Sequence, residues 1–431
     1  MTPSLRIARL AVAGSVAVLA AGALAQPQQV VKPPIAQYWL DVATHSMAGM
    51  PELPGMPSLP SFMGGGGATG GNHYGNTRGM TPGRWLDLAL HTRNKPSGTE
   101  ATHAIPAGMQ MGNALPLIPY VAPPRSVTTP HEPTEEGIPE PPKGRLLIYW
   151  GCSETVRSGQ PRVIDLAGDP RAFGRAFGGR YAPDRGARVA PGYSIWPNEQ
   201  NRTMVPRGAS LVGEHAINGD GVPASMKFAI GAAQDLMPPI ELSSSGALAD
   251  SVALQWTAVP NARAYYLHAM GHAGSDMILW SSAETPDTGM GLFDYLPNAT
   301  IDRWVGEKAL LAPSTTRCAV PKGIFASGGE SGAMLRMIAW GSELNLAHPP
   351  RPTDRRIPWE PEWNVRVRVK ATTMAMLGAE ISGAPEQAPE TRAGRRDRGE
   401  PASGEAGQES GSLIPGVPGG AIDAIRSIFG R

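Results

Sequence analysis

The sequence has 431 residues, and 38 Lys and Arg nearly balance 37 Asp and Glu, so the formal charge of +1 gives no electrostatic reason to expect nucleic acid or an anionic membrane as a general partner of the whole chain. The 53 Gly and 44 Pro approach a quarter of the residues, which predicts short strands joined by long loops. Helical patterns are scarce and β-patterned runs are common, so we expect an all-β protein.

The N-terminus carries an export pattern. Arg6 and Arg9 precede an apolar run, Leu10–Leu24, which ends in an A-x-A motif at Ala25 before Gln26. The run of about 15 residues is shorter than the roughly 20 that span a bilayer. We therefore expect residues 1–25 to be a secretory signal peptide, with no transmembrane span after cleavage and a periplasmic or secreted location.

Residues 26–120 contain a repeated strand pattern. Tyr38–His45 (YWLDVATH) reappears as Arg84–His91 (RWLDLALH), and the alternation in both segments predicts two strands that can pair. The Gly/Met/Pro-rich stretch between them has too few apolar residues to fold alone, so we expect a mobile loop. Residues 121–143 hold seven prolines and predict an extended linker.

The same loop raises the possibility of a metal site. Thioether and imidazole groups are ligands that suit Cu(I), so a periplasmic copper-binding protein is one alternative. The spacings are irregular, however, and methionine also serves as adaptable packing. The metal site therefore stays unknown, and we predict no cofactor. The residues concerned are His45, Met47, Met50, Met56, Met63, His73 and Met80, with Met109 and Met111 further along.

Residues 144–237 predict a first compact β-domain. Strand-like runs at Ser210–Val212 and Ser225–Phe228 flank Asn218–Gly221, whose Asn and Gly residues tolerate positive φ. This arrangement predicts a β-hairpin.

Residues 240–377 predict a second β-domain. Two alternating apolar runs are separated by a turn at Asn261, in the pattern Leu254-x-Trp256-x-x-Val259-x-x-Ala262-x-x-Tyr265-x-Leu267. This pattern resembles the B–C strand pair of a fibronectin type III domain. The resemblance implies an immunoglobulin-like β-sandwich, a fold that does not by itself specify a function.

Two later segments of this domain have clear patterns. Residues 299–307 show one apolar face and predict a short helix. In Trp363–Lys370, valines alternate with Arg366, Arg368 and Lys370. We interpret this charged row as the solvent-exposed face of an edge strand, where charge discourages aggregation.

The two cysteines, Cys152 and Cys318, fall in different predicted domains. In an oxidising compartment they can form a disulfide, provided that the fold brings their Cα atoms within about 7 Å. The alternative is two buried thiols that act as small apolar groups. The sequence leaves both open.

The C-terminal region changes composition abruptly. Residues 378–420 are rich in Glu, Arg, Pro, Gly and Ser and predict a disordered tail. Residues 421–429 then place Ile422, Ile425, Ile428 and Phe429 on one helical face. A helix of nine residues is unstable alone in water, so we expect it to dock on a partner or back on its own domain.

The sequence thus predicts two β-sandwich-like domains with a Gly/Met/Pro-rich N-terminal extension and a disordered C-terminal tail. Whether the chain is an enzyme stays uncertain, but plausible catalytic groups are few. We expect a non-catalytic envelope or extracellular protein that binds or assembles other envelope proteins. The alternative is a carbohydrate-binding or carbohydrate-active protein that uses the loop tryptophans Trp196, Trp359 and Trp363, since exposed aromatic rings can stack on sugars.

Overall fold

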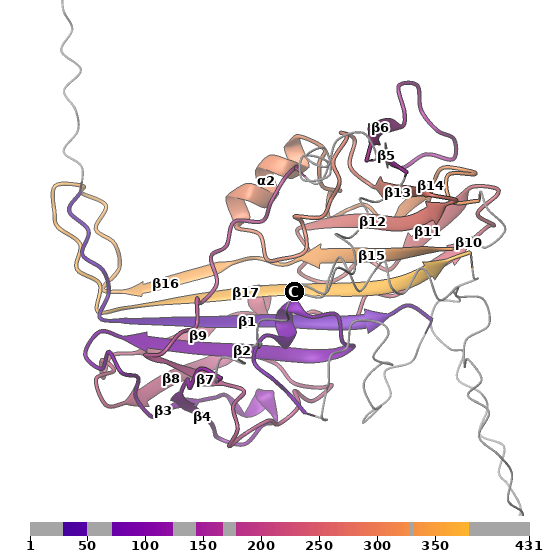
Figure 1. The fold of residues 1–431 in the computed structure, drawn as a ribbon. Helices are drawn as coiled ribbons and strands as arrows, with labels where there is room; N and C mark the ends of the chain where they lie inside the picture. The colour runs from indigo at the N-terminus through magenta and orange to yellow at the C-terminus, as the bar shows by residue number, and fades with distance from the viewer. Residues whose placement is uncertain (1–28, 50–70, 124–143, 167–177, 327–331, 379–431) are drawn as a thin grey trace, which may run out of the picture.

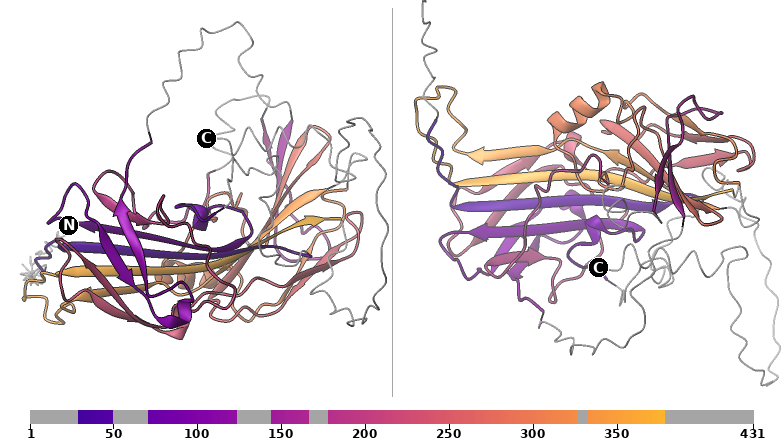
Figure 2. Two further views of the ribbon diagram at one scale, coloured as in Figure 1. Left: turned by 90° about the horizontal axis from the view of Figure 1, so that it is seen from below. Right: turned by 45° about the horizontal axis from the view of Figure 1, so that its top comes forward.

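The computed structural model describes residues 29–49, 71–123, 144–166, 178–326 and 332–378. The predicted signal peptide, most of the Gly/Met/Pro-rich loop, the linker from residue 124 and the C-terminal tail with its helix lie outside these residues. The described part is an all-β protein built on one long, twisted sheet, shown in Figures 1 and 2. None of its helices is long and apolar enough to cross a membrane.

The large sheet has 14 strands in the order β6-β5-β13-β12-β15-β17-β1-β2-β7-β4-β3-β8-β9, with β16 also paired to β17. A second sheet has three strands, in the order β10-β11-β14. The strands are β1 (Ala36–Met47), β2 (Gly83–Thr92), β3 (Ala101–Ala104), β4 (Ala114–Pro119), β5 (Arg145–Trp150), β6 (Arg162–Asp165), β7 (Tyr193–Trp196), β8 (Gly213–Gly219), β9 (Lys227–Ile230), β10 (Leu242–Ser245), β11 (Val252–Trp256), β12 (Ala264–Ala273), β13 (Asp276–Ser281), β14 (Arg317–Val320), β15 (Ala333–Trp340), β16 (Leu344–His348) and β17 (Trp363–Leu377). The helical elements are η2 (Asn76–Arg78), η3 (Ala107–Met109), η4 (Ala232–Gln234) and α2 (Asn298–Gly306).

Three sequence predictions about local structure are confirmed. The two copies of the repeat form β1 and β2, which pair antiparallel with Asp41 opposite Asp87. β8 and β9 form the predicted hairpin, although Asn218 and Gly219 belong to β8 and the connection is residues 220–226. The run Ser210–Val212, predicted as a strand, precedes β8 and is not one. The segment 299–307 corresponds to α2, which buries Ile301 and Trp304.

The centre of the large sheet joins the two ends of the described chain. β1 and β17 run parallel in register from Ala36 opposite Trp363 to Met47 opposite Met374. β5 likewise runs parallel to β13. Strands from residues 26–120, 144–237 and 240–377 therefore share one sheet, and the strands of the predicted domains are interleaved.

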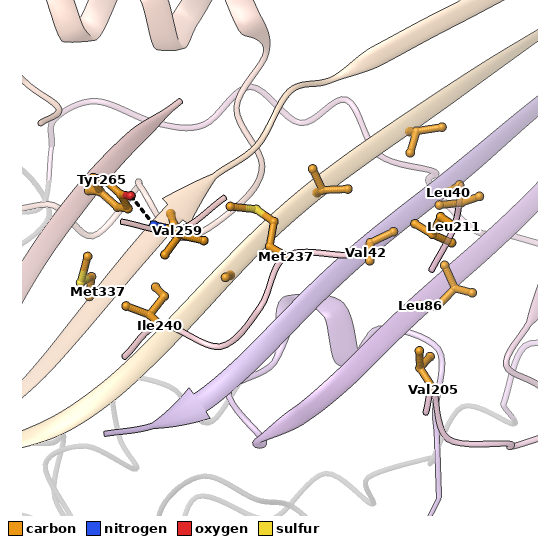
Figure 3. Close-up of a cluster of buried hydrophobic side chains, with 14 of the residues drawn as sticks. Leu40, Val42, Leu86, Val205, Leu211, Met237, Ile240, Val259, Tyr265 and Met337 are labelled. Atoms are coloured by element: carbon orange, nitrogen blue, oxygen red, sulfur yellow. Dashed lines mark hydrogen bonds between the residues drawn. The ribbon is translucent and has the colours of Figure 1, made fainter. Parts of the chain in front are cut away.

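One face of the central strands forms the main apolar core. Strand alternation places Leu40 and Val42 of β1 on this face with Leu86 of β2 (Figure 3). Met237 and Ile240, from the segment before β10, belong to the same cluster. The Thr44 hydroxyl donates a hydrogen bond to the Met237 carbonyl at 2.7 Å, which ties that segment to β1.

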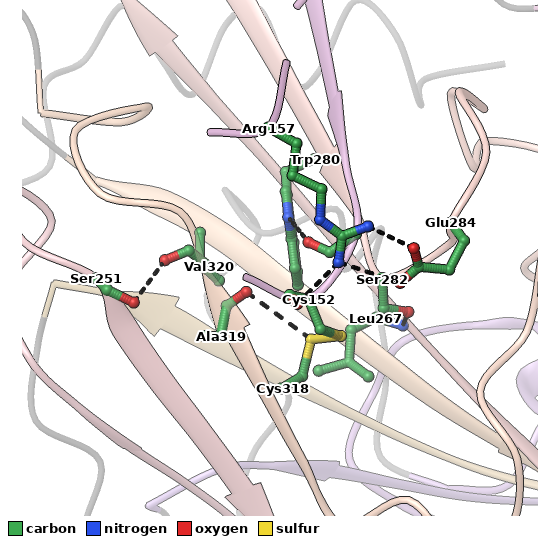
Figure 4. The surroundings of a disulfide bond; sticks show 11 residues. Cys152, Arg157, Ser251, Leu267, Trp280, Ser282, Glu284, Cys318, Ala319 and Val320 are labelled. Atoms are coloured by element: carbon green, nitrogen blue, oxygen red, sulfur yellow. Dashed lines mark hydrogen bonds and ion pairs between the residues drawn. A yellow bond between two sulfur atoms is a disulfide. The ribbon is translucent and has the colours of Figure 1, made fainter. Parts of the chain in front are cut away.

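The three-stranded sheet is tied to the large sheet by a disulfide. Cys152 follows β5 and Cys318 lies on β14, with their Cα atoms 4.9 Å apart (Figure 4). The Ser153 amide donates to the Ala319 carbonyl at 3.1 Å beside the bond. The sequence separation of 166 residues means that the bond closes a long loop, which the chain-entropy model equates with about 5 kcal/mol of stability.

Candidate functional site

The opposite face of the central strands carries charged side chains that are buried. Because side chains alternate along a strand, Asp41 of β1, Asp87 of β2, and Arg368 and Lys370 of β17 lie on the face away from Leu40. Asp41 stands opposite both Asp87 and Arg368 in register. Together with Arg336 of β15, these residues form what we call the charged cluster; each is at most 9% exposed.

The buried charges contradict our interpretation of the charged row in β17. That strand is central, with β1 on one side and β15 and β16 on the other, and Arg368 and Lys370 are only 2% and 1% exposed. The edge-strand interpretation was therefore wrong. Alternation of valine with charge indicates two different faces, but it does not say whether the charged face meets water or a covering segment.

Arg368 and Asp41 form the strongest pair in the cluster. The Arg368 Nε donates to Asp41 Oδ1 at 2.6 Å, and Nη2 donates to Oδ2. Burial alone would lower the pKa of Arg368, but the charge and hydrogen bonds of Asp41 outweigh burial and raise it. The pair is therefore a bidentate ion pair that stays charged.

Asp87 fixes a turn onto the sheet. Its carboxylate accepts hydrogen bonds from the Gly75 amide at 3.0 Å, the Thr77 amide at 3.4 Å and the Thr77 hydroxyl. Burial raises the pKa of Asp87 to about 7, because these hydrogen bonds only partly offset the loss of solvation. The carboxylate thus secures the segment that contains η2.

A second segment covers the cations. The Lys370 Nζ donates to the Phe293 carbonyl at 3.2 Å, and burial lowers the pKa of Lys370 to about 7. The Tyr295 ring centroid is 4.4 Å from both the Lys370 Nζ and the Arg368 Cζ. The Arg336 Cζ lies 4.3 Å from the Phe293 ring centroid. Aromatic faces from one segment therefore cap three buried cations.

These contacts indicate that the charged cluster supports the fold. Two carboxylates beside a lysine whose pKa is about 7 are groups that acid–base catalysis uses. Here, however, each is buried and engaged by the protein's own backbone or side chains. The cluster joins two covering segments to the sheet and leaves these groups without ready access from solvent.

A second buried polar network lies among the apolar side chains of the other face. Tyr38 hydroxyl, His103 and His215 form a chain with heavy-atom distances of 3.0 and 2.9 Å, and His215 Nε2 lies 2.8 Å from the Leu211 carbonyl. The carbonyl can only accept, so neutral His215 donates there and accepts from His103, which in turn accepts from Tyr38. Burial lowers the pKa of both histidines, which favours these neutral forms.

The three predicted ligand-binding tryptophans are placed differently. Trp196 is fully buried, and Trp363 is 5% exposed and stacked on His348. Trp359 is partly exposed, with Arg351 against its ring. Trp359 is therefore the member of this set that a ligand can reach without rearrangement of the protein. Glycan binding stays a prediction.

The candidate copper ligands are dispersed in the part of the chain that the structure describes. His45 is buried, with Nδ1 2.6 Å from the Thr372 hydroxyl, and burial, assisted by the charges of Lys370 and Arg336, lowers its pKa to about 3. Met109 and Met111 belong to the apolar core. Met50, Met56 and Met63 lie outside the described residues, within which no three His, Cys, Asp or Glu side chains are grouped as a metal site requires.

Two shallow surface grooves lie away from the charged cluster. The larger, of about 550 Å³, crosses the outer side of β10, β11 and β14 and is lined by Glu241, Ser243, Gln255, Trp256, Thr257, Thr316 and Arg317. The smaller, of about 220 Å³, is lined by Glu100, Ala101, Thr102, Pro116, Leu117, Ile118, Gln200 and Asn218.

The chain matches no protein-family model, and comparison with curated proteins and with solved structures gives no significant match. The functional argument therefore depends on the chemistry of the described residues. Sequence reasoning missed the charged cluster, although one signal pointed to it: both copies of the repeat place an aspartate, Asp41 and Asp87, within an otherwise apolar strand.

Proposed function

We propose that this protein is an exported, non-catalytic component of the cell envelope or extracellular space that binds and assembles other envelope proteins. The observation that carries the proposal is the closed state of the charged cluster. Its acids and bases hold segments 75–77 and 293–295 against the sheet, so they act as internal supports of a rigid platform. A platform of this kind serves binding through its surface.

The proposal includes a fibronectin type III-like architecture for residues 240–377. Its support is the division of strands between sheets: β10, β11 and β14 lie in one sheet, whereas β12, β13, β15 and β17 are adjacent in the other. Trp256 and Tyr265 meet between these sheets, with ring centroids 5.6 Å apart. β1 and β2 then extend the second sheet beyond the sandwich.

Export and assembly can be tested together in the native host. A C-terminally tagged full chain should appear in the envelope or the medium with Gln26 as its first residue, and in-cell cross-linking should yield a discrete complex with envelope proteins. Intact Met1 on a cytosolic protein would contradict the proposed location. An exported protein that stays monomeric after cross-linking would contradict assembly.

The C-terminal helix is the proposed recruiting element, although it lies outside the described residues. Burying Ile422, Ile425, Ile428 and Phe429 contributes about 1.5–3 kcal/mol per side chain before ordering costs. The double substitution Ile425→Asp and Phe429→Asp should abolish the cross-linked complex and leave the melting temperature of the β-structure unchanged. A melting temperature several degrees lower would instead place the helix in the fold.

Carbohydrate binding is the second candidate, favoured by the larger groove. Ser243, Gln255 and Arg317 stand in register across its three strands, and such a mixture of hydrogen-bond donors and acceptors suits a hydroxyl-rich ligand. On a glycan array, the parent should bind a defined sugar class and Gln255→Ala should bind it more weakly. Gln200→Ala, in the smaller groove, is the matched control. An equal loss of binding in both variants would show that the sugar does not bind specifically in the larger groove.

A further inference from the structure

A two-segment arm extends the fold beyond the starts of β1 and β17. We define the arm as residues 29–35 together with residues 349–361; in Figure 1 its indigo and orange segments rise together at the left of the sheet. The parallel pairing of β1 with β17 continues into it through a bridge between Val31 and Trp359. The Trp359 amide donates to the Val30 carbonyl at 2.8 Å, and the Lys32 amide donates to the Trp359 carbonyl at 3.0 Å.

Polar contacts give the arm a defined structure. The Gln29 Nε2 donates to the Ile357 carbonyl at 2.8 Å, and its Oε1 accepts from Arg351 Nε at 2.7 Å. The Arg351 Cζ lies 5.3 Å from the Trp359 ring centroid, and the indole Nε1 donates to the Pro349 carbonyl at 3.0 Å. The two segments are thus linked through both backbone and side chains.

The arm presents apolar side chains to solvent. Val30, Val31 and Ile357 are 61%, 47% and 51% exposed. The Trp359 ring, two positions after Ile357 in the sequence, is partly exposed. Single exposed apolar residues are ordinary on protein surfaces. Here three exposed aliphatic side chains share one small projection beside a tryptophan, which is typical of an interaction site.

The arm also differs from the near-neutral chain in its charge. It holds four cations, Lys32, Arg351, Arg355 and Arg356, and two acids, Asp354 and Glu360, which gives a net charge of +2. Lys32 pairs with Glu360 at 2.7 Å and Arg356 with Asp354 at 2.8 Å. The Arg355 side chain is exposed, where it can meet an external anion.

We propose that the arm docks on an anionic lipid surface. Aliphatic side chains and a tryptophan beside cations are the chemistry by which a protein lies at a membrane interface without spanning it. The position of the arm agrees, since its first residue, Gln29, follows the predicted cleavage site at Ala25 by four residues, which can span at most about 13–14 Å. This last argument rests on the proposed export.

The test uses the purified mature chain, residues 26–431, and sedimentation with sucrose-loaded vesicles. We expect binding to vesicles of phosphatidylglycerol and phosphatidylethanolamine in equal parts, weaker binding to phosphatidylcholine vesicles, and a decrease with added salt. Ile357→Asp should lower the partition constant about tenfold, because it removes an apolar contact and adds a negative charge. Arg355→Gln should lower it severalfold.

The matched control is Val163→Asp. Val163 is 50% exposed, close to the 51% of Ile357, but it lies on the edge strand β6. The control should bind like the parent. Val163→Asp and Ile357→Asp should both keep the parental melting temperature, because each site is exposed. Absence of vesicle binding, equal loss in Val163→Asp, or equal binding to neutral vesicles would overturn the inference. Arm-dependent cross-linking to an envelope protein without vesicle binding would overturn it in favour of a protein partner, while leaving the proposed assembly function intact.

Discussion

The two faces of β1 are buried to the same degree by different means. On one face Leu40 and Val42 pack among apolar side chains, and on the other Asp41 pairs with Arg368 under a covering segment. Apolar burial is non-directional and tolerates changes of shape, whereas a buried ion pair depends on both partners. The comparison shows that burial alone does not distinguish a core from a polar support, and that the two faces should respond differently to mutation and to pH.

The largest expected effect comes from breaking the ion pair. Asp41→Ala leaves the Arg368 guanidinium buried without its partner, and we expect a loss of about 3–5 kcal/mol in the free energy of unfolding. Urea unfolding measures it. A loss below about 1 kcal/mol would mean that water reaches Arg368 and that the face is open.

The corresponding change on the apolar face is Leu88→Ala. Leu88 stands opposite Leu40 and has no exposed surface, so truncation should cost about 2–5 kcal/mol through lost burial and a cavity. This loss should be constant between pH 6 and pH 9, because no titratable group is removed. A strong pH dependence of the Leu88→Ala effect would show that the two faces are energetically coupled.

Lys370 distinguishes the faces through pH. Its pKa is about 7 in the folded protein and 10.5 when unperturbed, so between these values the unfolded chain binds more protons than the folded chain. Stability from this group therefore increases as pH rises from 7 towards 10 and is lost as pH falls through 7, with a slope of up to about one proton. The increase should disappear in Lys370→Met, as measured by unfolding at pH 7, 8 and 9. An equal slope of stability against pH in parent and variant would show that another group causes the pH dependence.

The smallest effect concerns the polar chain within the apolar face. Tyr38→Phe removes the hydroxyl that donates to His103 and leaves His103 Nδ1 unpaired, which should cost about 1–3 kcal/mol. The imidazole resonances of His103 and His215 should both shift in NMR spectra, because the two rings share a hydrogen bond. Unchanged His215 resonances would show that the chain is interrupted.

The sequence predicted the elements that a repeat, a turn motif or a helical spacing encodes. The β1–β2 pair follows from the repeat, and the β8–β9 hairpin and α2 follow from turn chemistry and helical spacing. The parallel pairing of β1 with β17 was out of reach, since the contact between Asp41 and Arg368 spans 327 residues and no local pattern encodes it. The burial of Arg368 and Lys370 was missed for the same reason, because their cover comes from Phe293 and Tyr295, far away in the chain.

The most direct test of the account replaces the ion pair by apolar residues of similar size. A buried ion pair that only supports the fold can be exchanged for packed apolar groups at little cost in stability. We therefore predict that Asp41→Leu combined with Arg368→Met unfolds within about 2 kcal/mol of the parent and is exported and cross-linked to the same envelope proteins. A double variant that keeps its stability and its location but loses the cross-linked complex would contradict the account and make the charged cluster part of the functional site.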